Sequence, residues 1–185
     1  GHPSSPSQDS LCHPGPLTLD RYGNLFVSDH NLETEGNWRL LEFDAAAIPL
    51  QPTTPVFAIP ASRVYGRNGS FTQPSCQPND PICGPWEPVF YPNNDMVLGF
   101  NSYLGPHFPQ VYHDPLTNSL PYAALQDFYS HAYSARLDSQ NNLYVLDLTR
   151  HHVLIYKPGT DIPTATPTPT NISTPTSTET PIGTP

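Results

Sequence analysis

The chain contains an internal repeat, which constrains its fold more than any single residue does. Residues 17–29 (LTLDRYGNLFVSD) align with residues 135–147 (ARLDSQNNLYVLD), and each stretch is followed by a second apolar run, at 39–43 and at 152–156. A sequence that recurs within one chain encodes a recurring structural unit. The chain is therefore predicted to stack equivalent units against one another.

Each copy predicts a β-hairpin. Turn-forming residues stand at 20–24 (DRYGN) and 138–142 (DSQNN), where Gly and Asn supply the positive φ angles that tight hairpins require. The short apolar segments 17–19 and 25–28 flank the first turn, as strands beside such a turn do. The apolar run at 39–43 is expected to add a third strand.

A degenerate third copy lies between these two. Residues 88–99 (PVFYPNNDMVLG) match the pattern, with Asn93 and Asn94 at the turn and Gly99 at the position of the closing Asp. Further strands are expected at 108–112 and 123–128 in this copy, and at 56–59 as the fourth strand of the first copy. The last copy ends at Tyr156 with no evident fourth strand.

Composition supports an all-β protein. The 25 prolines are far more than a helical protein carries, because proline interrupts helices. A net charge of −9 with only 7 Lys and Arg argues against a nucleic-acid partner. No apolar run approaches the roughly 20 residues that cross a bilayer. The start carries neither Met nor a signal-like segment, so a processed mature form or a fragment is expected.

The amino-acid sequence of the hairpins resembles the NHL repeat. The resemblance is carried by residues 23–29 and 37–43 in the first copy, and by residues 142–147 and 150–156 in the last. It implies four-stranded β-propeller blades over residues 14–157, and it says little about function.

The expected organisation follows from this resemblance. Residues 1–13 form an N-terminal extension and 158–185 a Thr/Pro-rich tail; the copies lie near 16–60, 86–128 and 131–157, with an insertion near 61–85. About three blades are too few to close a ring, which usually takes about four to eight. The chain is a fragment of a longer propeller, carries further unrecognised blades, or closes between subunits by strand exchange. We favour self-assembly.

The tail is predicted to be extended and non-globular, because it holds almost nothing to bury. Thr beside Pro is typical of O-glycosylated stalks, and a flexible linker to a further domain is the simpler alternative. The expected O-glycosylation sites are Thr164, Thr166, Thr168, Thr170, Thr174, Thr176, Thr178 and Thr180. Asn68 and Asn171 begin N-glycosylation sequons.

The three cysteines allow one pair and leave one over. Cys76 and Cys83 flank a loop rich in Pro and Asp and are predicted to form a disulfide, with two reduced thiols as the alternative. Cys12 is expected to be a buried thiol, or less simply to bridge to another chain. The three lack the spacing of a zinc site.

No residue is assigned a catalytic or metal-binding role, and no cofactor is expected. The recurring Asp20, Asp29, Asp138 and Asp147 are expected to cap turns or to accept backbone N–H bonds, because a residue that recurs at the same place in each blade does not define one site. The histidines are scattered near predicted strand ends: His13, His30, His107, His113, His131, His151 and His152. An aromatic surplus, expected mostly to pack between blades, comprises Trp86, Tyr103, Phe108, Tyr112, Tyr122, Phe128, Tyr129 and Tyr133.

The functional expectation is an extracellular or cell-surface structural protein, without enzymatic activity, that assembles with copies of itself and carries glycans on its tail. One alternative is a metal-dependent propeller enzyme of the lyase or lactonase kind, of which this chain is a part. The other is a carbohydrate-binding module that uses exposed aromatic side chains.

Overall fold

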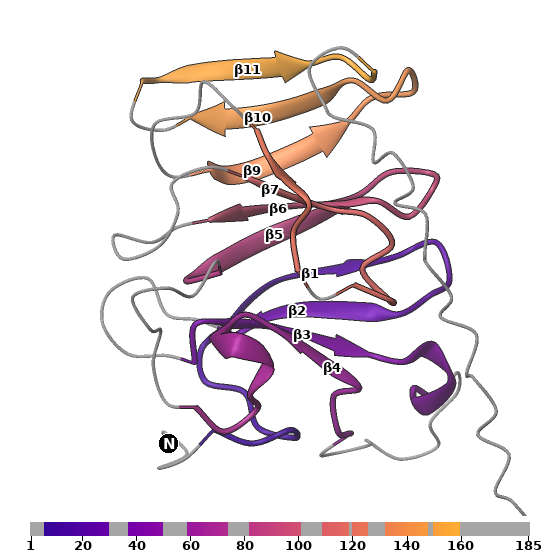
Figure 1. The fold of residues 1–185 in the computed structure, drawn as a ribbon, viewed down its shortest axis with the longest axis vertical. Helices are drawn as coiled ribbons and strands as arrows, with labels where there is room; N and C mark the ends of the chain where they lie inside the picture. Colours follow the sequence, from indigo (N-terminus) through magenta and orange to yellow (C-terminus); the bar gives the residue numbers. More distant parts are fainter. Residues whose placement is uncertain are drawn as a thin grey trace, which may run out of the picture.

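The computed structural model describes residues 6–29, 37–49, 59–73, 82–100, 109–118, 120–125, 132–147 and 150–159. Within these ranges the protein is all-β: eleven strands form three antiparallel sheets, accompanied by two short 3-10 helices and no α-helix (Figure 1). This agrees with the expected fold class and is compatible with a propeller-like arrangement of blades. The described part of the chain also holds no helix with the length and apolar character needed to cross a bilayer.

Each sheet is built from strands that neighbour one another in the sequence. The first sheet has the order β1 (Pro14–Leu19), β2 (Leu25–Asp29), β3 (Arg39–Phe43) and β4 (Arg63–Tyr65). The second has the order β5 (Pro85–Phe90), β6 (Met96–Phe100), β7 (Gln110–Tyr112) and β8 (Ala123–Ala124). The third holds β9 (Ala132–Leu137), β10 (Leu143–Asp147) and β11 (His152–Tyr156). The helices η1 (Ala45–Ala47) and η2 (Arg67–Gly69) follow β3 and β4.

The three hairpins share one turn geometry, which confirms the repeat as a structural unit. In each, the N–H of the first turn residue donates to the C=O of the fifth: Asp20 to Asn24 at 3.0 Å, Tyr91 to Asp95 at 2.8 Å and Asp138 to Asn142 at 3.1 Å. The fourth residue adopts positive φ, +85° at Gly23, +74° at Asn94 and +64° at Asn141. Only Gly and Asn occupy this position, as the left-handed backbone favours.

The register of the second hairpin corrects the expected alignment. Pro14 pairs with Asp29 in the first sheet, and Pro85 pairs with Phe100 in the second. Phe100, and not Gly99, therefore stands at the position of Asp29. Both pairings follow an irregularity in the first strand, between Pro14 and Leu17 and between Pro85 and Pro88.

The fourth strand of the first sheet is not the segment expected from the sequence. β4 pairs with β3 through Tyr65 and Leu40, Val64 and Leu41, and Arg63 and Glu42. It therefore lies inside the segment expected to be an insertion, rather than at 56–59. The segment 63–65 suits this position because successive strand residues point to opposite faces, so that Val64 and Tyr65 pack in separate apolar clusters on the two sides of the sheet. Of the segment 56–59, only Ile59 lies among the described residues, and it is not in a strand.

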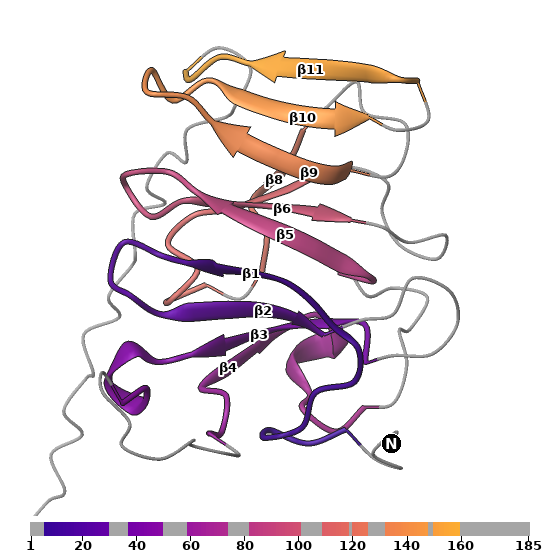
Figure 2. The same cartoon turned by 180° about the vertical axis from the view of Figure 1, so that it is seen from behind.

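The sheets are arranged side by side, with the first strand of each at the centre. β1 packs beside β5, and β5 beside β9. From these inner strands the first and third sheets extend on either side of the second sheet (Figures 1 and 2). This arrangement is compatible with consecutive blades of a propeller-like fold.

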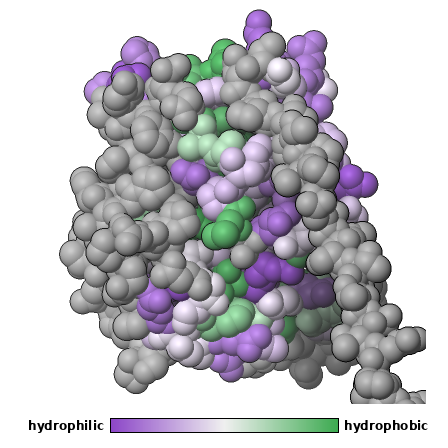
Figure 3. All heavy atoms as spheres, in the orientation of Figure 1, coloured by the Kyte–Doolittle hydropathy of each residue, from purple (hydrophilic) through white to green (hydrophobic). Residues whose placement is uncertain are grey.

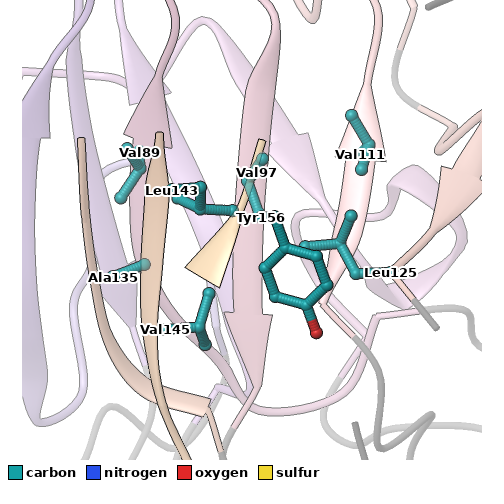
Figure 4. Close-up of a cluster of buried hydrophobic side chains, with 8 residues drawn as sticks. All are labelled: Val89, Val97, Val111, Leu125, Ala135, Leu143, Val145 and Tyr156. Carbon is teal, nitrogen blue, oxygen red and sulfur yellow. The ribbon is translucent and has the colours of Figure 1, made fainter. Parts of the chain in front are cut away.

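Two apolar cores join the three sheets. The core between the first and second sheets comprises Phe26, Leu40, Tyr65, Ile82, Met96, Leu98 and Tyr112. The core between the second and third comprises Val89, Val97, Val111, Leu125, Ala135, Leu143, Val145 and Tyr156 (Figure 4). Because strand residues alternate between faces, each middle residue of β6 serves a different core from its neighbours.

Candidate interaction surfaces

The recurring aspartates of the turns act structurally, as the repeat predicts. The Oδ1 atom of Asp20 accepts from the backbone N–H groups of Tyr22 and Asn24 at 2.8 and 2.9 Å. The Oδ1 atom of Asp138 accepts from Gln140 and Asn142 at 2.9 Å each. The side-chain amide of Asn142 donates to Asp138 Oδ2 at 2.8 Å, and this bond, together with the two backbone bonds, holds the pKa of Asp138 below its ordinary value. Each carboxylate therefore orders its own turn.

The aspartates that close the second strands have a different structural role. Asp29 is fully buried, and its Oδ2 atom accepts from Arg39 Nε at 2.9 Å and from Asn37 Nδ2 at 2.8 Å. Its Oδ1 atom accepts from the N–H of Cys12 at 2.5 Å. Asp147 is buried as well, and its Oδ1 atom accepts from the N–H of Arg150 at 3.0 Å.

Arg39 extends this network toward the start of the chain. Its Nη2 atom donates to the carbonyl oxygens of Ser7 at 2.9 Å and Ser10 at 2.7 Å, and its Nη1 atom donates to that of Phe71 at 2.5 Å. The buried guanidinium is thus surrounded by acceptors, as a desolvated charge requires. The Asp29–Arg39 pair fastens two chain segments onto the first sheet.

The described histidines do not converge on a metal site. His13, His113, His151 and His152 are exposed, and within the described ranges no three His, Cys, Asp or Glu side chains lie close enough together to hold a metal ion. His113 Nδ1 lies 2.8 Å from Asp95 Oδ1, which ties β7 to the turn of the second hairpin. His30, His107 and His131 lie outside the described residues.

The modification sites fall mainly outside the described residues. Asn171 and all eight tail threonines belong to this group, whereas Asn68 lies in η2. Cys83 is buried, but Cys76 is not described, so the bond between them stays a prediction. Cys12 is buried, as expected, and within the described part of this single chain it forms no disulfide.

Two pairs of aromatic side chains pack between the first and second sheets. Phe26 and Phe90 approach across the first core with ring centroids 4.7 Å apart, and Tyr65 and Tyr112 do so at 5.9 Å in an edge-to-face arrangement. Tyr112 was expected to pack between blades, and it does. Tyr103, Phe108, Phe128 and Tyr129 lie outside the described residues.

Each sheet presents two faces, which we name by their neighbours. The forward face points toward the next sheet in the chain, and the rear face toward the preceding one. The forward face of the first sheet (Phe26, Leu40, Tyr65) packs on the rear face of the second (Met96, Leu98, Tyr112). The forward face of the second (Val89, Val97, Val111) packs on the rear face of the third (Leu143, Val145, Tyr156).

No protein-family model matches this chain, and no curated protein matches it.

Two faces remain that no described sheet covers. One is the rear face of the first sheet, where Leu17 and Leu19 are exposed, whereas Leu25 and Val27 pack with Ile48 and Ile59. The other is the forward face of the third sheet, with Tyr144, Leu146, Val153 and Ile155. The strand registers place these residues on common faces, because Leu17 pairs with Val27 and Tyr144 pairs with Ile155. Both faces carry apolar side chains, although they belong to the first and last sheets of the arc that the three sheets form and have a neighbouring sheet on one side only.

Equivalent positions in the three sheets show how unusual this exposure is. Leu17 is 65% exposed, whereas its counterpart Ala135 in the third sheet is 5% exposed. Ile155 is 55% exposed, whereas its counterpart Val111 in the second sheet is 0% exposed. At Leu17 and Ile155 the end faces therefore expose apolar side chains at positions that are buried in the neighbouring sheets.

The rear face of the first sheet is also hollowed. A cavity of about 240 Å³ is lined by Asp9, Leu11, Leu25, Val27, Phe43, Ile48 and Ile59. All of its lining residues except Asp9 are apolar. By contrast, the side of the molecule in Figure 3 shows hydrophobic residues scattered among hydrophilic ones, so the described residues visible there form no continuous apolar surface.

Sequence reasoning did not identify these two faces as the candidate site. The signal was present, because β10 and β11 are apolar at nearly every position rather than alternating. A strand that is apolar on both faces is expected to be buried on both.

Proposed function

We propose that this protein is an extracellular or cell-surface structural protein that assembles with copies of itself through the end faces of its blade arc. The observation that supports the proposal is the pair of apolar faces at the two ends, which have the composition of the internal sheet contacts. Full burial of one Leu or Ile side chain is favourable by about 1.5–3 kcal/mol relative to exposure. Several such residues on each face provide a driving force for association.

The blades are proposed to be of the NHL type. The shared turn, the position of the aspartates and the four-stranded order of the first two sheets support this assignment. The assignment concerns architecture, and it leaves the surface chemistry to determine function.

The tail is proposed to be a glycosylated arm that projects from the assembly. Its Thr/Pro composition supports O-glycosylation, and the two sequons at Asn68 and Asn171 support N-glycosylation. Glycans and the proposed Cys76–Cys83 bond both belong to a secretory environment. The assembled protein would then display a hydrophilic coat outside an apolar contact.

Light scattering coupled to gel filtration tests the proposal on the full chain. Absorbance and refractive index recorded together separate protein mass from glycan mass. We expect a protein mass that is a multiple of the chain mass, and mass spectrometry is expected to detect hexose-type additions on tail peptides. A single species with the mass of one unmodified chain at micromolar concentration would refute the proposal.

A further inference from the structure

We propose that two copies of this chain close a ring of six sheets, in which the forward face of the third sheet of each copy packs on the rear face of the first sheet of the other. The inference rests on the proposed self-assembly and specifies its partner, contact surfaces and stoichiometry. It follows from the internal contacts of the chain, the direction of its sheets and the number of its blades.

The chain already forms this contact twice within itself. A forward face packs on a rear face between the first and second sheets, and again between the second and third. By the same pattern, the forward face of the third sheet is expected to pack on a rear face. Among the described sheets, the rear face that no other sheet covers is that of the first sheet. In a single chain these two faces lie at opposite ends of the arc, so a second copy must supply the match.

The direction of the sheets favours closure over continued growth. The first and third sheets extend from the inner strands on either side of the second sheet, so the three sheets occupy one side of a ring (Figure 2). A two-fold axis along the centre of that ring places a second copy on the other side. Both contacts between the copies are then equivalent, as closed symmetry requires.

The number of sheets leads to the same result. Propeller rings close with about four to eight blades. With three sheets per chain, two copies give six sheets, which is the one multiple of three within that range. A third copy would exceed it.

The repeat also predicts which side chains meet across the new contact. Phe26 of the first sheet lies against Phe90 of the second, with ring centroids 4.7 Å apart. Tyr144 occupies the position of Phe26, because each is the second residue of its returning strand. Leu19 occupies the position of Phe90, because Leu19 pairs with Leu25 and Phe90 pairs with Met96, the first residues of β2 and β6. We therefore expect Tyr144 of one copy to contact Leu19 of the other.

Cross-linking of the full chain tests this contact directly. Leu19→Cys and Tyr144→Cys are prepared separately and together, and each sample is treated with a short bismaleimide and separated on a denaturing gel. The double variant is expected to give a covalent dimer and no larger species. A mixture of the two single variants is expected to cross-link, and each single variant alone is not. The parent chain controls for its native cysteines.

A second pair of variants tests the energetics without a reagent. Val153→Lys with Ile155→Lys places two charges on the forward face and is expected to convert the dimer to monomer, as measured by light scattering. Leu120→Lys is the matched control, because Leu120 is 68% exposed and lies outside both end faces. It is expected to leave the dimer intact, and circular dichroism confirms that each variant is folded.

The outcomes separate the inference from the proposed function. A ladder of species beyond the dimer, cross-linking of Tyr144→Cys alone, or an assembly that survives the two lysines would overturn the two-copy ring while self-assembly stands. A chain that is monomeric from the outset would overturn both. A monomeric Tyr144→Cys variant whose introduced thiol resists maleimide would indicate that another part of the same chain covers the face, which overturns the ring.

Discussion

The Nε atom of Arg39 lies 2.9 Å from the Oδ2 atom of Asp29, and both side chains are fully buried. This ion pair sits where the first sheet meets the segment that precedes it. Removing one partner of a buried pair leaves the other charge without compensation, which costs about 3–5 kcal/mol.

Asp29→Ala is therefore expected to lower the free energy of unfolding by about 3–5 kcal/mol, measured by urea denaturation. Arg21→Met is the control, because Arg21 is exposed and its substitution is expected to cost less than about 1 kcal/mol. Equal effects of the two substitutions would show that burial of the pair does not govern its contribution.

The turn of the first hairpin gives a prediction about backbone conformation. Gly23 has φ of +85°, and a Cβ atom there would meet Ala45 Cβ at an ordinary 3.6 Å. Gly23→Ala is thus expected to destabilise through the left-handed backbone alone, by about 1–2 kcal/mol in thermal unfolding. Asn141→Gly, at the equivalent turn position with φ of +64°, is expected to be neutral or mildly stabilising. A Gly23→Ala protein as stable as the parent would contradict this account of the turn.

Asp138 gives a prediction about pH. Its folded-state pKa is lowered, chiefly by the side-chain hydrogen bond from Asn142. Because the folded pKa lies below the unfolded one, the stabilisation is present above the unfolded value of about 3.9 and is lost as the pH falls through the folded value. Asn142→Ala is expected to raise the Asp138 pKa, measured by carboxyl NMR titration.

The control for that titration is Gln140→Ala. Gln140 donates to Asp138 through its backbone N–H, which the substitution retains. The pKa of Asp138 is therefore expected to stay where it is in the parent. A shift as large as that in Asn142→Ala would mean that the side-chain amide is not the main cause.

The proposed disulfide gives a prediction about thiol counts. The chain has 3 cysteines, so denaturation without reductant is expected to expose one reactive thiol, from Cys12, and denaturation with reductant all of them. Cys76→Ser is expected to raise the count without reductant by one thiol, because Cys83 loses its partner. A parent chain with every thiol reactive before reduction would exclude the bond.

The hairpins could be predicted because their determinants are local. The positive φ at Gly23, Asn94 and Asn141 selects Gly or Asn, and that choice is visible in the sequence. The middle copy is recognisable in the sequence although Tyr91 replaces the aspartate of the other turns, because backbone bonds close the turn. The sequence pattern predicts its closing position one residue too early, at Gly99 instead of Phe100, because neither residue gives a local signal.

The fourth strand of the first sheet could not be placed in this way. The segments 56–59 and 63–65 are both short and apolar enough to serve, and the choice depends on contacts with distant strands. The hydroxyl group of Tyr65 lies within hydrogen-bond distance of Glu42 Oε2, at 2.9 Å, and of the carbonyl oxygen of Pro115, at 2.8 Å. Both partners are far from Tyr65 in the sequence. The pairing of a strand with partners distant in the sequence cannot be predicted from the local pattern of apolar and polar residues.

Arg39 also defines how far the folding unit reaches. Its guanidinium depends on carbonyl groups of Ser7 and Ser10, and Asp29 depends on the N–H of Cys12, although all three precede the first strand. A shortened version that begins at Pro14 would keep every strand of the first sheet and still remove these partners from a buried ion pair. The minimal autonomous domain therefore starts at or before Ser7, and expression boundaries chosen from strand limits alone would cut into it.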